Sequence, residues 1–390
     1  MSGIYRCLVR PVLFEQESEA VHDWTLQRLA YVSRNALLCE AVASFFEPPE
    51  LTARLFGLSF PNPVGLAAGM DKHAVALPAW AALGFGFVEL GGVTWHPQPG
   101  NPPPRIFRAI PDEALVNRMG FNNPGAGAMA TTLREWRVSG RWPDHPVGMN
   151  LGKSKITPLD KAAEDYAASL RVLWPHADFF VINVSSPNTP NLRQLQDKSA
   201  LAEILAATCD VNRELAITAG AVSGRGLARN PNSKIQHAKS KKPILVKVAP
   251  DLSFEAIDEI LELVETHEIA GIVATNTTTA RPPASDPRSE RAYAEAGGLS
   301  GRPLRARSTE MIRHIFRRSG GALPIIGVGG IFSAEDAWEK IAAGASLVQV
   351  YTGLVFEGPA LAKEIVLGLH ARLAEARLNR IQEAVGFCAA

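Results

Sequence analysis

Eight short apolar runs alternate with eight stretches of helical character between residues 64 and 377. The apolar runs have the length of strands and occupy residues 64–67, 85–93, 146–149, 178–182, 243–248, 271–275, 323–328 and 347–351. The helical stretches that follow them lie at 74–83, 124–139, 157–174, 198–217, 254–267, 304–318, 334–343 and 359–377. Alternation of this kind is typical of a parallel sheet covered by helices, and eight units predict a closed (β/α)8 TIM barrel.

A doubly wound sheet is the alternative fold for the same alternation. That fold would require a G-x-G-x-x-G motif after the first strand, and no such motif follows residues 64–67.

Two predicted helices have sequence signals for their first residue. Ser253 is expected to cap the helix at 254–267, and Ser333 with Asp336 forms a capping pair for the helix at 334–343.

The first 50 residues differ from this pattern. Residues 20–46 have helical character with no strand alternation, and a stripe of apolar side chains between Leu37 and Phe46 falls on one helical face. The prediction is an N-terminal helical hairpin, either docked on the barrel or lying with its apolar face on a membrane surface. The chain is therefore divided into an extension at 1–50, a barrel domain at 51–378 and a C-terminal tail at 379–390.

Composition excludes several classes of protein. A net charge of +1 with 46% hydrophobic residues indicates a soluble globular chain and gives no reason to expect a nucleic acid partner. The four cysteines are scattered without C-x-x-C spacing, which argues against a metal site or a disulfide framework and favours a reducing compartment. No apolar run approaches the ~18 residues of a membrane span. The first residues lack a signal-peptide core.

Two segments interrupt the alternation. Residues 218–242 are rich in Gly, Ser, Asn, Lys and Arg, which predicts a mobile, solvated surface insertion. Residues 281–298 are rich in Pro, Ala and charged residues and follow the sixth strand. A long loop at that end of a barrel is either a lid or a connection, and the sequence leaves both open.

Polar, small or basic residues stand at the C-terminal end of every predicted strand. The densest group is Asn-Val-Ser-Ser-Pro-Asn-Thr-Pro at 183–190, where prolines end the regular structure. Its side chains offer hydrogen-bond donors and acceptors to a small, planar, polar ligand. The remaining exits lie at 68–72, 91–94, 150, 247, 275–277, 327–330 and 351–353. Because barrel enzymes react at this end, we expect the active site here.

Glycines follow the seventh and eighth strands, at 327–330 and at 353. Barrels commonly bind phosphate at this place, and glycine lets the backbone approach the anion closely. Lys247 stands inside an apolar strand, and a buried lysine needs an anionic partner. That partner is either a structural carboxylate or negative charge on a cofactor ring. Lys72 also needs an anionic partner, and the same two alternatives apply to it.

Several long motifs, in order and in spacing, resemble dihydroorotate dehydrogenase over residues 60–370. They are AAGMDK at 67–72, GNPPPRIFR at 100–108, NRMGFNN at 117–123, NVSSPNTPNLR at 183–193, KVAPDL at 247–252, NTT at 276–278, GGLSGRPL at 297–304 and IGVGGI at 326–331. Two features resemble the membrane-associated, quinone-dependent class of that family: the helical extension, and a serine rather than a cysteine at Ser186. The insertion at 218–242 looks long for the family.

The resemblance implies an enzyme that oxidises (S)-dihydroorotate to orotate in pyrimidine synthesis, with FMN as cofactor and a quinone as electron acceptor. It implies Ser186 as the catalytic base, and Thr189 with a water near Phe121 as the proton path. The residues that it implies for FMN are Ala68, Gly69, Thr94, Asn150, Asn183, Lys247, Thr275, Gly301, Gly330, Tyr351 and Thr352. Those for the substrate are Lys72, Asn117, Arg118, Met119, Gly120, Phe121, Asn183, Asn188, Asn276 and Thr277.

The quinone contacts implied by the resemblance are His22, Arg108 and Tyr351, although His22 on the sequence alone also reads as a surface histidine. The implied location is peripheral, on the cytoplasmic face of the bacterial inner membrane, with the N-terminal helices on the membrane surface and no metal. Two other functions stay open: the soluble class of the family, which uses fumarate or NAD and a cysteine base, and a flavin-free barrel lyase or isomerase that acts on a phosphorylated sugar.

Overall fold

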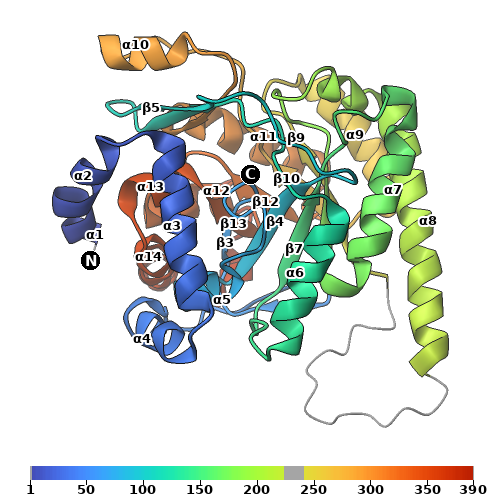
Figure 1. Cartoon of the computed structure of the whole chain (residues 1–390), viewed down its shortest axis with the longest axis horizontal. Coiled ribbons are helices and arrows are strands. Elements are labelled where there is room, and N and C mark those ends of the chain that lie inside the picture. Colours follow the sequence, from blue (N-terminus) through green and yellow to red (C-terminus); the bar gives the residue numbers. More distant parts are fainter. Residues whose placement is uncertain (1, 224–240, 390) are drawn as a thin grey trace.

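Eight parallel strands close into a barrel in a computed structural model of the chain, which describes residues 2–223 and 241–389 (Figure 1). Each strand pairs with the next one of the barrel in chain order, and the last pairs with the first. The strands are β3 (Val64–Leu66), β4 (Phe87–Val93), β7 (Val147–Leu151), β8 (Phe179–Asn183), β9 (Ile244–Val248), β10 (Gly271–Ala274), β12 (Ile325–Val328) and β13 (Leu347–Val350). The predicted TIM barrel is confirmed, and each predicted strand has its counterpart.

Helices surround the barrel and follow the strands as the sequence predicts (Figure 1). Ser253 accepts a hydrogen bond from the backbone N–H of Ala256, and Ser333 accepts one from Asp336, so both predicted caps are confirmed. The carboxylate of Asp336 accepts from the N–H of Phe332. The helices are α5 (Leu77–Ala82), α6 (Ala126–Val138), α7 (Ala162–Leu173), α8 (Lys198–Ser223), α9 (Phe254–Thr266), α11 (Arg305–Arg318), α12 (Ala334–Ala342) and α14 (Leu361–Glu375).

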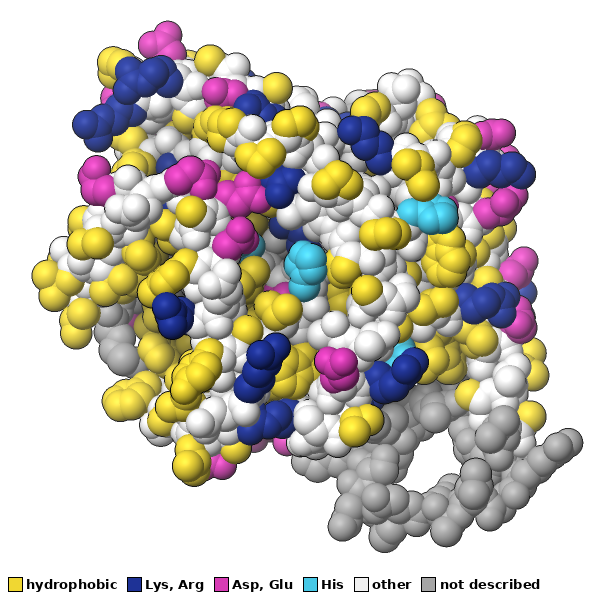
Figure 2. All heavy atoms as spheres, in the orientation of Figure 1, with side chains coloured by type: hydrophobic (Ala, Val, Ile, Leu, Met, Phe, Trp, Pro, Cys, Tyr) yellow, Lys and Arg dark blue, Asp and Glu magenta, His cyan; other side chains and the backbone are white. Residues whose placement is uncertain are grey.

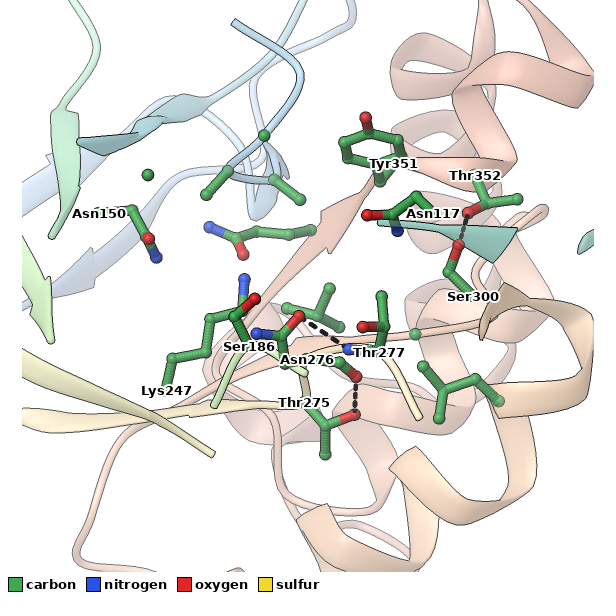
Figure 3. Close-up of a pocket in the computed structure, with 18 of the residues that line it drawn as sticks. Asn117, Asn150, Ser186, Lys247, Thr275, Asn276, Thr277, Ser300, Tyr351 and Thr352 are labelled. Carbon is green, nitrogen blue, oxygen red and sulfur yellow. Dashed lines mark hydrogen bonds between the residues drawn. The ribbon is translucent and has the colours of Figure 1, made fainter. Parts of the chain in front are cut away.

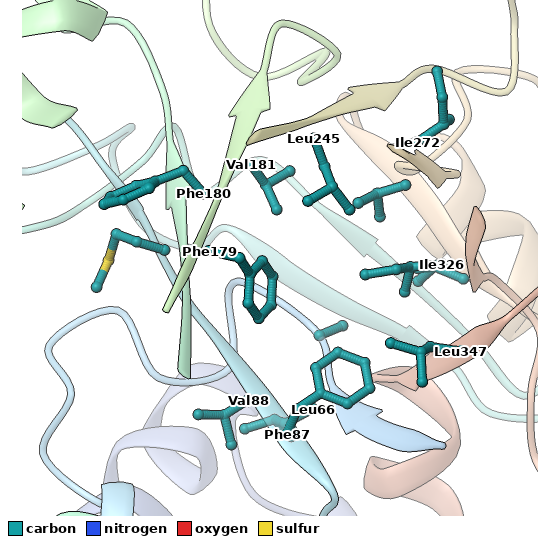
Figure 4. Close-up of a cluster of buried hydrophobic side chains, with 14 of the residues drawn as sticks. Leu66, Phe87, Val88, Phe179, Phe180, Val181, Leu245, Ile272, Ile326 and Leu347 are labelled. Carbon is teal, nitrogen blue, oxygen red and sulfur yellow. The ribbon is translucent and has the colours of Figure 1, made fainter. Parts of the chain in front are cut away.

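Aromatic rings fill the barrel interior on the side away from the strand exits (Figure 4). The rings of Phe87 and Phe179 lie 6.3 Å apart, and both are almost fully buried. Gly65 and Gly148 make room for them, because a Cβ at either position would lie within 2.3 Å of a ring carbon. The barrel is thus a packed core rather than a pore, which leaves its mouth as the place for a ligand.

The N-terminal extension is helical, as predicted, and its hairpin consists of α3 (Ser18–Ser33) and α4 (Ala36–Phe46). Ser33 fixes the hairpin to the barrel, because its hydroxyl accepts a 3.0 Å hydrogen bond from the N–H of Ala79. The sequence did not predict the short helical segments that precede the hairpin. These are α1 (Ser2–Ile4), a π-helical turn at Tyr5–Val9 and α2 (Arg10–Phe14).

A small antiparallel sheet that the sequence did not predict, called the mouth sheet below, lies beside the barrel mouth. Its strand order is β11 (Gly298–Gly301), β6 (Ala114–Asn117) and β5 (Ile106–Ala109), and α10 (Pro287–Tyr293) packs on it. Arg281 fixes the segment that leads into β11 by donating to the carbonyls of Tyr293, Glu295 and Gly297. The segment at 281–298 is therefore ordered and packs against the mouth sheet.

The remaining elements are short. They are the hairpin β1 (Ala53–Leu55) and β2 (Leu58–Phe60), α13 (Thr352–Glu357), and 3-10 turns at Leu159–Lys161, Trp174–His176, Leu192–Gln196, Arg302–Leu304 and Ile381–Ala384. The last turn lies in the C-terminal tail, where Ile381 and Ala384 are buried against the barrel domain.

The predicted insertion at 218–242 is corrected at both of its ends. Helix α8 continues to Ser223, so the first residues of the predicted insertion are helical. Lys242 is not a solvated loop residue, because its ammonium donates to the carbonyls of Trp174 and Ala177. Burial lowers the pKa of Lys242 to about 8, despite the nearby carboxylate of Asp178. Residues 224–240 lie outside the described residues.

Candidate functional site

The predicted strand exits converge on one cavity at the barrel mouth (Figure 3). Figure 3 shows Lys247 and Ser186 extending into one part of this mouth cavity, with Asn117 and Tyr351 on the opposite side. The predicted residues that line it are Ala68, Gly69, Lys72, Asn117, Met119, Gly120, Phe121, Asn150, Asn183, Ser186, Asn188, Lys247, Thr275, Asn276, Thr277, Gly301, Gly330, Tyr351 and Thr352.

Internal hydrogen bonds shape the loop after β8. Asn183 ends the strand, and its Oδ1 accepts from the N–H of Ser185 and from its hydroxyl, at 3.2 and 2.9 Å. Asn276 donates to the same Ser185 hydroxyl at 3.0 Å, so the exits of β8 and β10 are tied together. Ser186 then turns into the mouth cavity, where its Oγ accepts a long 3.3 Å bond from the N–H of Asn188.

Amides on opposite walls of the mouth cavity meet across it. Asn188 Nδ2 donates to Asn117 Oδ1 at 3.1 Å, which links the loop after β8 to the mouth sheet. The Oδ1 atom of Asn188 is buried and has no hydrogen-bond partner within the described chain. A buried acceptor without a partner is costly, so this atom is suited to accept a hydrogen bond from a ligand.

Beneath the floor of the mouth cavity lies a carboxylate that the sequence analysis missed. Glu89 on β4 is fully buried, and its two oxygens accept 2.6 Å hydrogen bonds from Asn150 Nδ2 and Gln349 Nε2. Gln349 lines the mouth cavity, and its Oε1 is a second buried acceptor without a partner among the described residues. The signal was present, since Glu89 is the one acidic residue in the apolar run Phe-Val-Glu-Leu-Gly-Gly-Val.

Glycines with left-handed backbone form one corner of the mouth cavity. The φ angles of Gly301, Gly329 and Gly330 are 102°, 124° and 72°. A Cβ on Gly330 would lie 2.8 Å from the backbone nitrogen of Arg305, so a side chain has no room there. Thr352 is held beside this corner by a 2.9 Å hydrogen bond from its hydroxyl to that of Ser300. Backbone N–H groups at such a corner are suited to an anion.

Lys72 and Lys247 supply the positive charge of the mouth cavity, and both are buried. Burial and the neighbouring Arg105 lower the pKa of Lys72 to about 8, while Glu19, Asp23 and Asp71 act in the opposite direction. Asp71 is otherwise occupied, because its oxygens accept from the N–H groups that follow it and from the Trp80 indole. Both lysines are thus available to an anionic ligand.

Three of the residues predicted for FMN, for the substrate or for catalysis do not line the mouth cavity. Arg118 points away and forms an ion pair with Glu295, so a direct role of its guanidinium in substrate binding has no support in the structure. Thr94 hydrogen-bonds to the carbonyl of His96 behind the wall. Thr189 is buried within the loop after β8, and its hydroxyl has no partner among the described residues.

A second, apolar cavity of about 530 Å³ lies between the N-terminal extension and the barrel, and it contains all three predicted quinone residues. Burial, together with the positive charges of Lys72 and His73, lowers the pKa of His22 to about 3. Burial raises the pKa of Tyr351 to about 12. Arg108 donates to the carbonyls of Phe14 and Gln16 at the end of α2. Tyr351 also lines the mouth cavity, so it separates the two.

The closed parallel barrel has a polar cavity with a glycine corner at its mouth and an apolar cavity on the other side of Tyr351. These features define a barrel enzyme that binds one polar and one apolar ligand. A family model described as "Dihydroorotate dehydrogenase" matches residues 50–373. The chain belongs to the dihydroorotate dehydrogenase family, and the resemblance stated above is confirmed.

Relatives that resemble the chain over nearly its full length are named dihydroorotate dehydrogenase (quinone). One from Gloeobacter violaceus is 49% identical and covers 98% of both chains, and one from Chloroflexus aurantiacus is 51% identical and covers 93% of this chain and 94% of its own. A solved structure of the enzyme from Eimeria tenella in complex with ferulenol superposes with a TM-score of 0.81, at 34% identity over 95% of each chain.

Proposed function

We propose that the chain oxidises dihydroorotate to orotate in the mouth cavity and passes the electrons to a quinone in the apolar cavity. The observation that carries this proposal is the wall that the two cavities share at Tyr351. The net reaction removes two electrons and two protons from neighbouring ring carbons, and these form the quinol. Family membership and the quinone-dependent relatives support the same activity.

The residues present fit FMN. Its phosphate would lie at the corner formed by Gly301, Gly329 and Gly330, where side chains are excluded. Its ring system would lie over the floor, where Gln349 Oε1 is an acceptor without a partner among the described residues and Lys247 supplies positive charge. When bound, FMN supplies the chemistry that accepts a hydride from dihydroorotate and later reduces the quinone. Lys247 would stabilise negative charge on the ring.

The pyrimidine would lie between the two polar walls, with Asn117, Asn188 and Asn276 bonding to its edges. Asn188 Oδ1 is free within the described chain to accept a ring N–H. Lys72 would pair with the substrate carboxylate, because its buried side chain lines the same cavity. Asn183, Thr277 and the backbone at Met119 and Gly120 would complete the fit.

Ser186 would take the proton from the substrate ring carbon. A serine hydroxyl is a weak base and needs a path that carries the proton away. The buried hydroxyl of Thr189 lies three residues further along the same loop and accepts no bond from any described residue, so it can take part in that path. Phe121 would shield this path from the cavity wall, where its ring lies 2.7 Å from the place of a Cβ on Gly92.

The quinone would occupy the apolar cavity, with its carbonyl oxygens near His22, Arg108 and Tyr351. With a pKa of about 3, the imidazole of His22 is neutral near pH 7, and it can donate one hydrogen bond and accept another. The hydroxyl of Tyr351 stays protonated and can donate as well. These groups suit a molecule with an apolar tail and polar carbonyl tips.

The N-terminal helices would hold the enzyme on a membrane surface. None of the helices in the described part of the chain combines the length and the apolar character needed to cross a bilayer. Large apolar side chains are instead exposed on them, and Figure 2 shows such side chains gathered over the region of α2 and α4. They are Ile4, Leu8, Val9, Val12, Trp24, Tyr31, Leu37 and Phe45. Peripheral attachment, at the cytoplasmic face in a bacterium, brings the apolar cavity to lipid-dissolved quinone.

The test is a pair of half-reactions on the purified protein. We expect a yellow protein whose cofactor, released by heat, behaves as FMN in chromatography. Anaerobic mixing with (S)-dihydroorotate should bleach the flavin, and a long-tailed quinone should restore its colour. Absence of bleaching, with flavin bound, would exclude dihydroorotate as the reductant. Bleaching that only fumarate or NAD reverses would exclude the quinone.

A further inference from the structure

The N-terminal extension contacts the barrel through a shielded ion pair close to the mouth cavity. Glu19 lies in the first turn of α3, and Arg105 lies just before β5. Arg105 Nε donates to both carboxylate oxygens of Glu19, at 2.9 and 3.0 Å, and Nη2 donates to Oε1 at 2.7 Å. The two side chains are only 13% and 11% exposed, and a shielded, forked pair is among the stronger hydrogen-bonded contacts of proteins.

The other end of the Arg105 guanidinium continues the path toward the mouth cavity. Its Nη1 donates to the carbonyls of Pro99 and Asn101, both at 2.8 Å. Asn101 Nδ2 donates in turn to the carbonyl of Asn188, at 3.0 Å. Three hydrogen-bonded steps therefore lead from the extension to an amide that lines the cavity.

The two chain segments along this path are closely packed. A Cβ on Gly100 would lie 2.3 Å from the carbonyl oxygen of Met119, and a Cβ on Gly120 would lie 2.8 Å from the Asn101 amide. Met119 and Gly120 both line the mouth cavity. Because packed segments shift as units, a displaced Arg105 would move the cavity wall along with Asn101.

We propose that Glu19 of the N-terminal extension is a positioning residue for the pyrimidine end of the mouth cavity, acting through Arg105 and Asn101 on Asn188. The inference rests on the proposed function, because that function assigns the pyrimidine to this end. If the extension bound only the quinone and the barrel bound only the substrate, dihydroorotate binding would not depend on the extension. The extension completes the dihydroorotate site as well.

Charge acts in the same direction as geometry. Glu19 and Asp23, both on α3, raise the pKa of Lys72 against the effects of burial and of Arg105. The carboxylate of Glu19 thus helps to keep the lysine that would bind the substrate carboxylate in its charged form. Loss of this carboxylate would act on the pyrimidine site by two routes, whereas a change at Asn101 would act by the geometric route alone.

The experiment compares Glu19→Gln and Asn101→Ser with the control Arg6→Gln in the full-length holoenzyme. Arg6 forms a different ion pair between extension and barrel, at 3.4 Å to Glu357, and it lines neither cavity. The measured quantities are flavin content, the dissociation constant of orotate from the flavin spectrum, and the rates of bleaching by dihydroorotate and of recolouring by quinone.

Glu19→Gln and Asn101→Ser should each weaken orotate binding about five- to tenfold, the size expected when one hydrogen bond of the path is lost. Flavin content and recolouring by quinone should stay near those of the wild type, and Arg6→Gln should match the wild type throughout. The double variant should be weaker than the wild type by less than the product of the two single effects, because both changes interrupt one path.

Orotate binding of wild-type strength in Glu19→Gln would overturn the inference. If that variant does not fold, orotate binding of wild-type strength in Asn101→Ser would overturn it instead. Equal weakening in Arg6→Gln would also overturn it, since the effect would then belong to general loosening of the extension. Failure of the proposed function is distinguishable, because the wild-type protein would then not be bleached by dihydroorotate.

Discussion

Glu89 Oε2 accepts a 2.6 Å hydrogen bond from Nε2 of Gln349, and this contact sets which atom of the Gln349 amide is left for a ligand. The amide nitrogen is held by the carboxylate, so Oε1 remains as an acceptor without a partner in the described chain. Glu89 is therefore expected to act through Gln349 and Asn150 rather than by touching a ligand.

Replacing Glu89 by Gln should disrupt one of the two hydrogen bonds beneath the floor of the mouth cavity. The amide of the new side chain can accept from only one of Asn150 and Gln349. Its NH2 group would then face the NH2 group of the other residue, unless the Gln349 amide turns over. We expect flavin retention to fall about tenfold, the effect of about 1.4 kcal/mol. Fluorescence of released flavin on dilution measures it, and retention equal to that of the wild type would contradict the role given to Glu89.

Ser186→Ala should bind flavin and orotate normally but lose about 10²- to 10⁴-fold in the rate of flavin bleaching by dihydroorotate, as expected when a positioned base is lost. Ser186→Cys should keep part of the rate, because a thiolate can also take a proton. Stopped-flow absorbance gives the rate. A bleaching rate of wild-type size in the alanine variant would remove Ser186 from the base role.

Lys247→Gln should lower the reduction potential of the bound flavin, because a positive charge beside the ring favours its reduced, anionic form. A fall of about 30 mV corresponds to about 1.4 kcal/mol for a two-electron couple. Redox titration of the purified variant measures the shift. An unchanged potential at full flavin occupancy would mean that Lys247 serves only to hold the fold.

His22→Ala and Arg108→Ala should each raise KM for a long-tailed quinone and leave KM for dihydroorotate nearly unchanged. With its pKa lowered to about 3, His22 is neutral in wild-type enzyme across the working range, so recolouring by quinone should show no inflection from this imidazole near its ordinary pKa of 6.5. The pH profile of the wild type, with His22→Gln as control, tests this. An inflection near 6.5 that disappears in His22→Gln would show that the imidazole takes up a proton in the working range.

The buried side chain of Lys340 should make the free energy of unfolding of the protein depend on pH. It is fully buried between α11 and α12, where its ammonium donates to Thr309 Oγ1 and to the carbonyl of Arg305 at 2.6 Å. Burial lowers its pKa from 10.5 to about 7, opposed by Glu339 and Asp336, whose carboxylates raise it. Between these two values the unfolded chain holds a proton that the folded chain has lost. The penalty of burying the charge is thus complete below about pH 7 and fades as the pH rises.

The contribution of Lys340 to the free energy of unfolding should consequently rise with pH, by at most about 1.4 kcal/mol per pH unit. In Lys340→Met this contribution is absent. The urea midpoint of the wild type, compared with that of the variant, should therefore increase between about pH 7 and about pH 9. A constant difference across that range would show that Lys340 carries its charge unperturbed in the folded protein.

The barrel was predictable because its strands are buried on both faces and so appear as continuous apolar runs, as in Phe179–Asn183. The site was predictable because each of these runs ends in polar residues. The mouth sheet was not predictable, since its strands are short and Gly298–Gly301 pairs with Ala114–Asn117 only through tertiary contacts far along the chain. The direction of the Arg118 side chain was not predictable for a related reason: a position in a motif does not say toward which side a long side chain turns.

The shared wall at Tyr351 has a consequence for inhibition. Two cavities that touch at one side chain can be filled at the same time, since neither ligand occupies the space of the other. An apolar molecule that blocks the outer cavity would therefore stop turnover however much dihydroorotate is present, and an orotate analogue would do so however much quinone is present. The two kinds of blocker could be given together, and joining them into one compound would require a linker thin enough to pass a tyrosine ring.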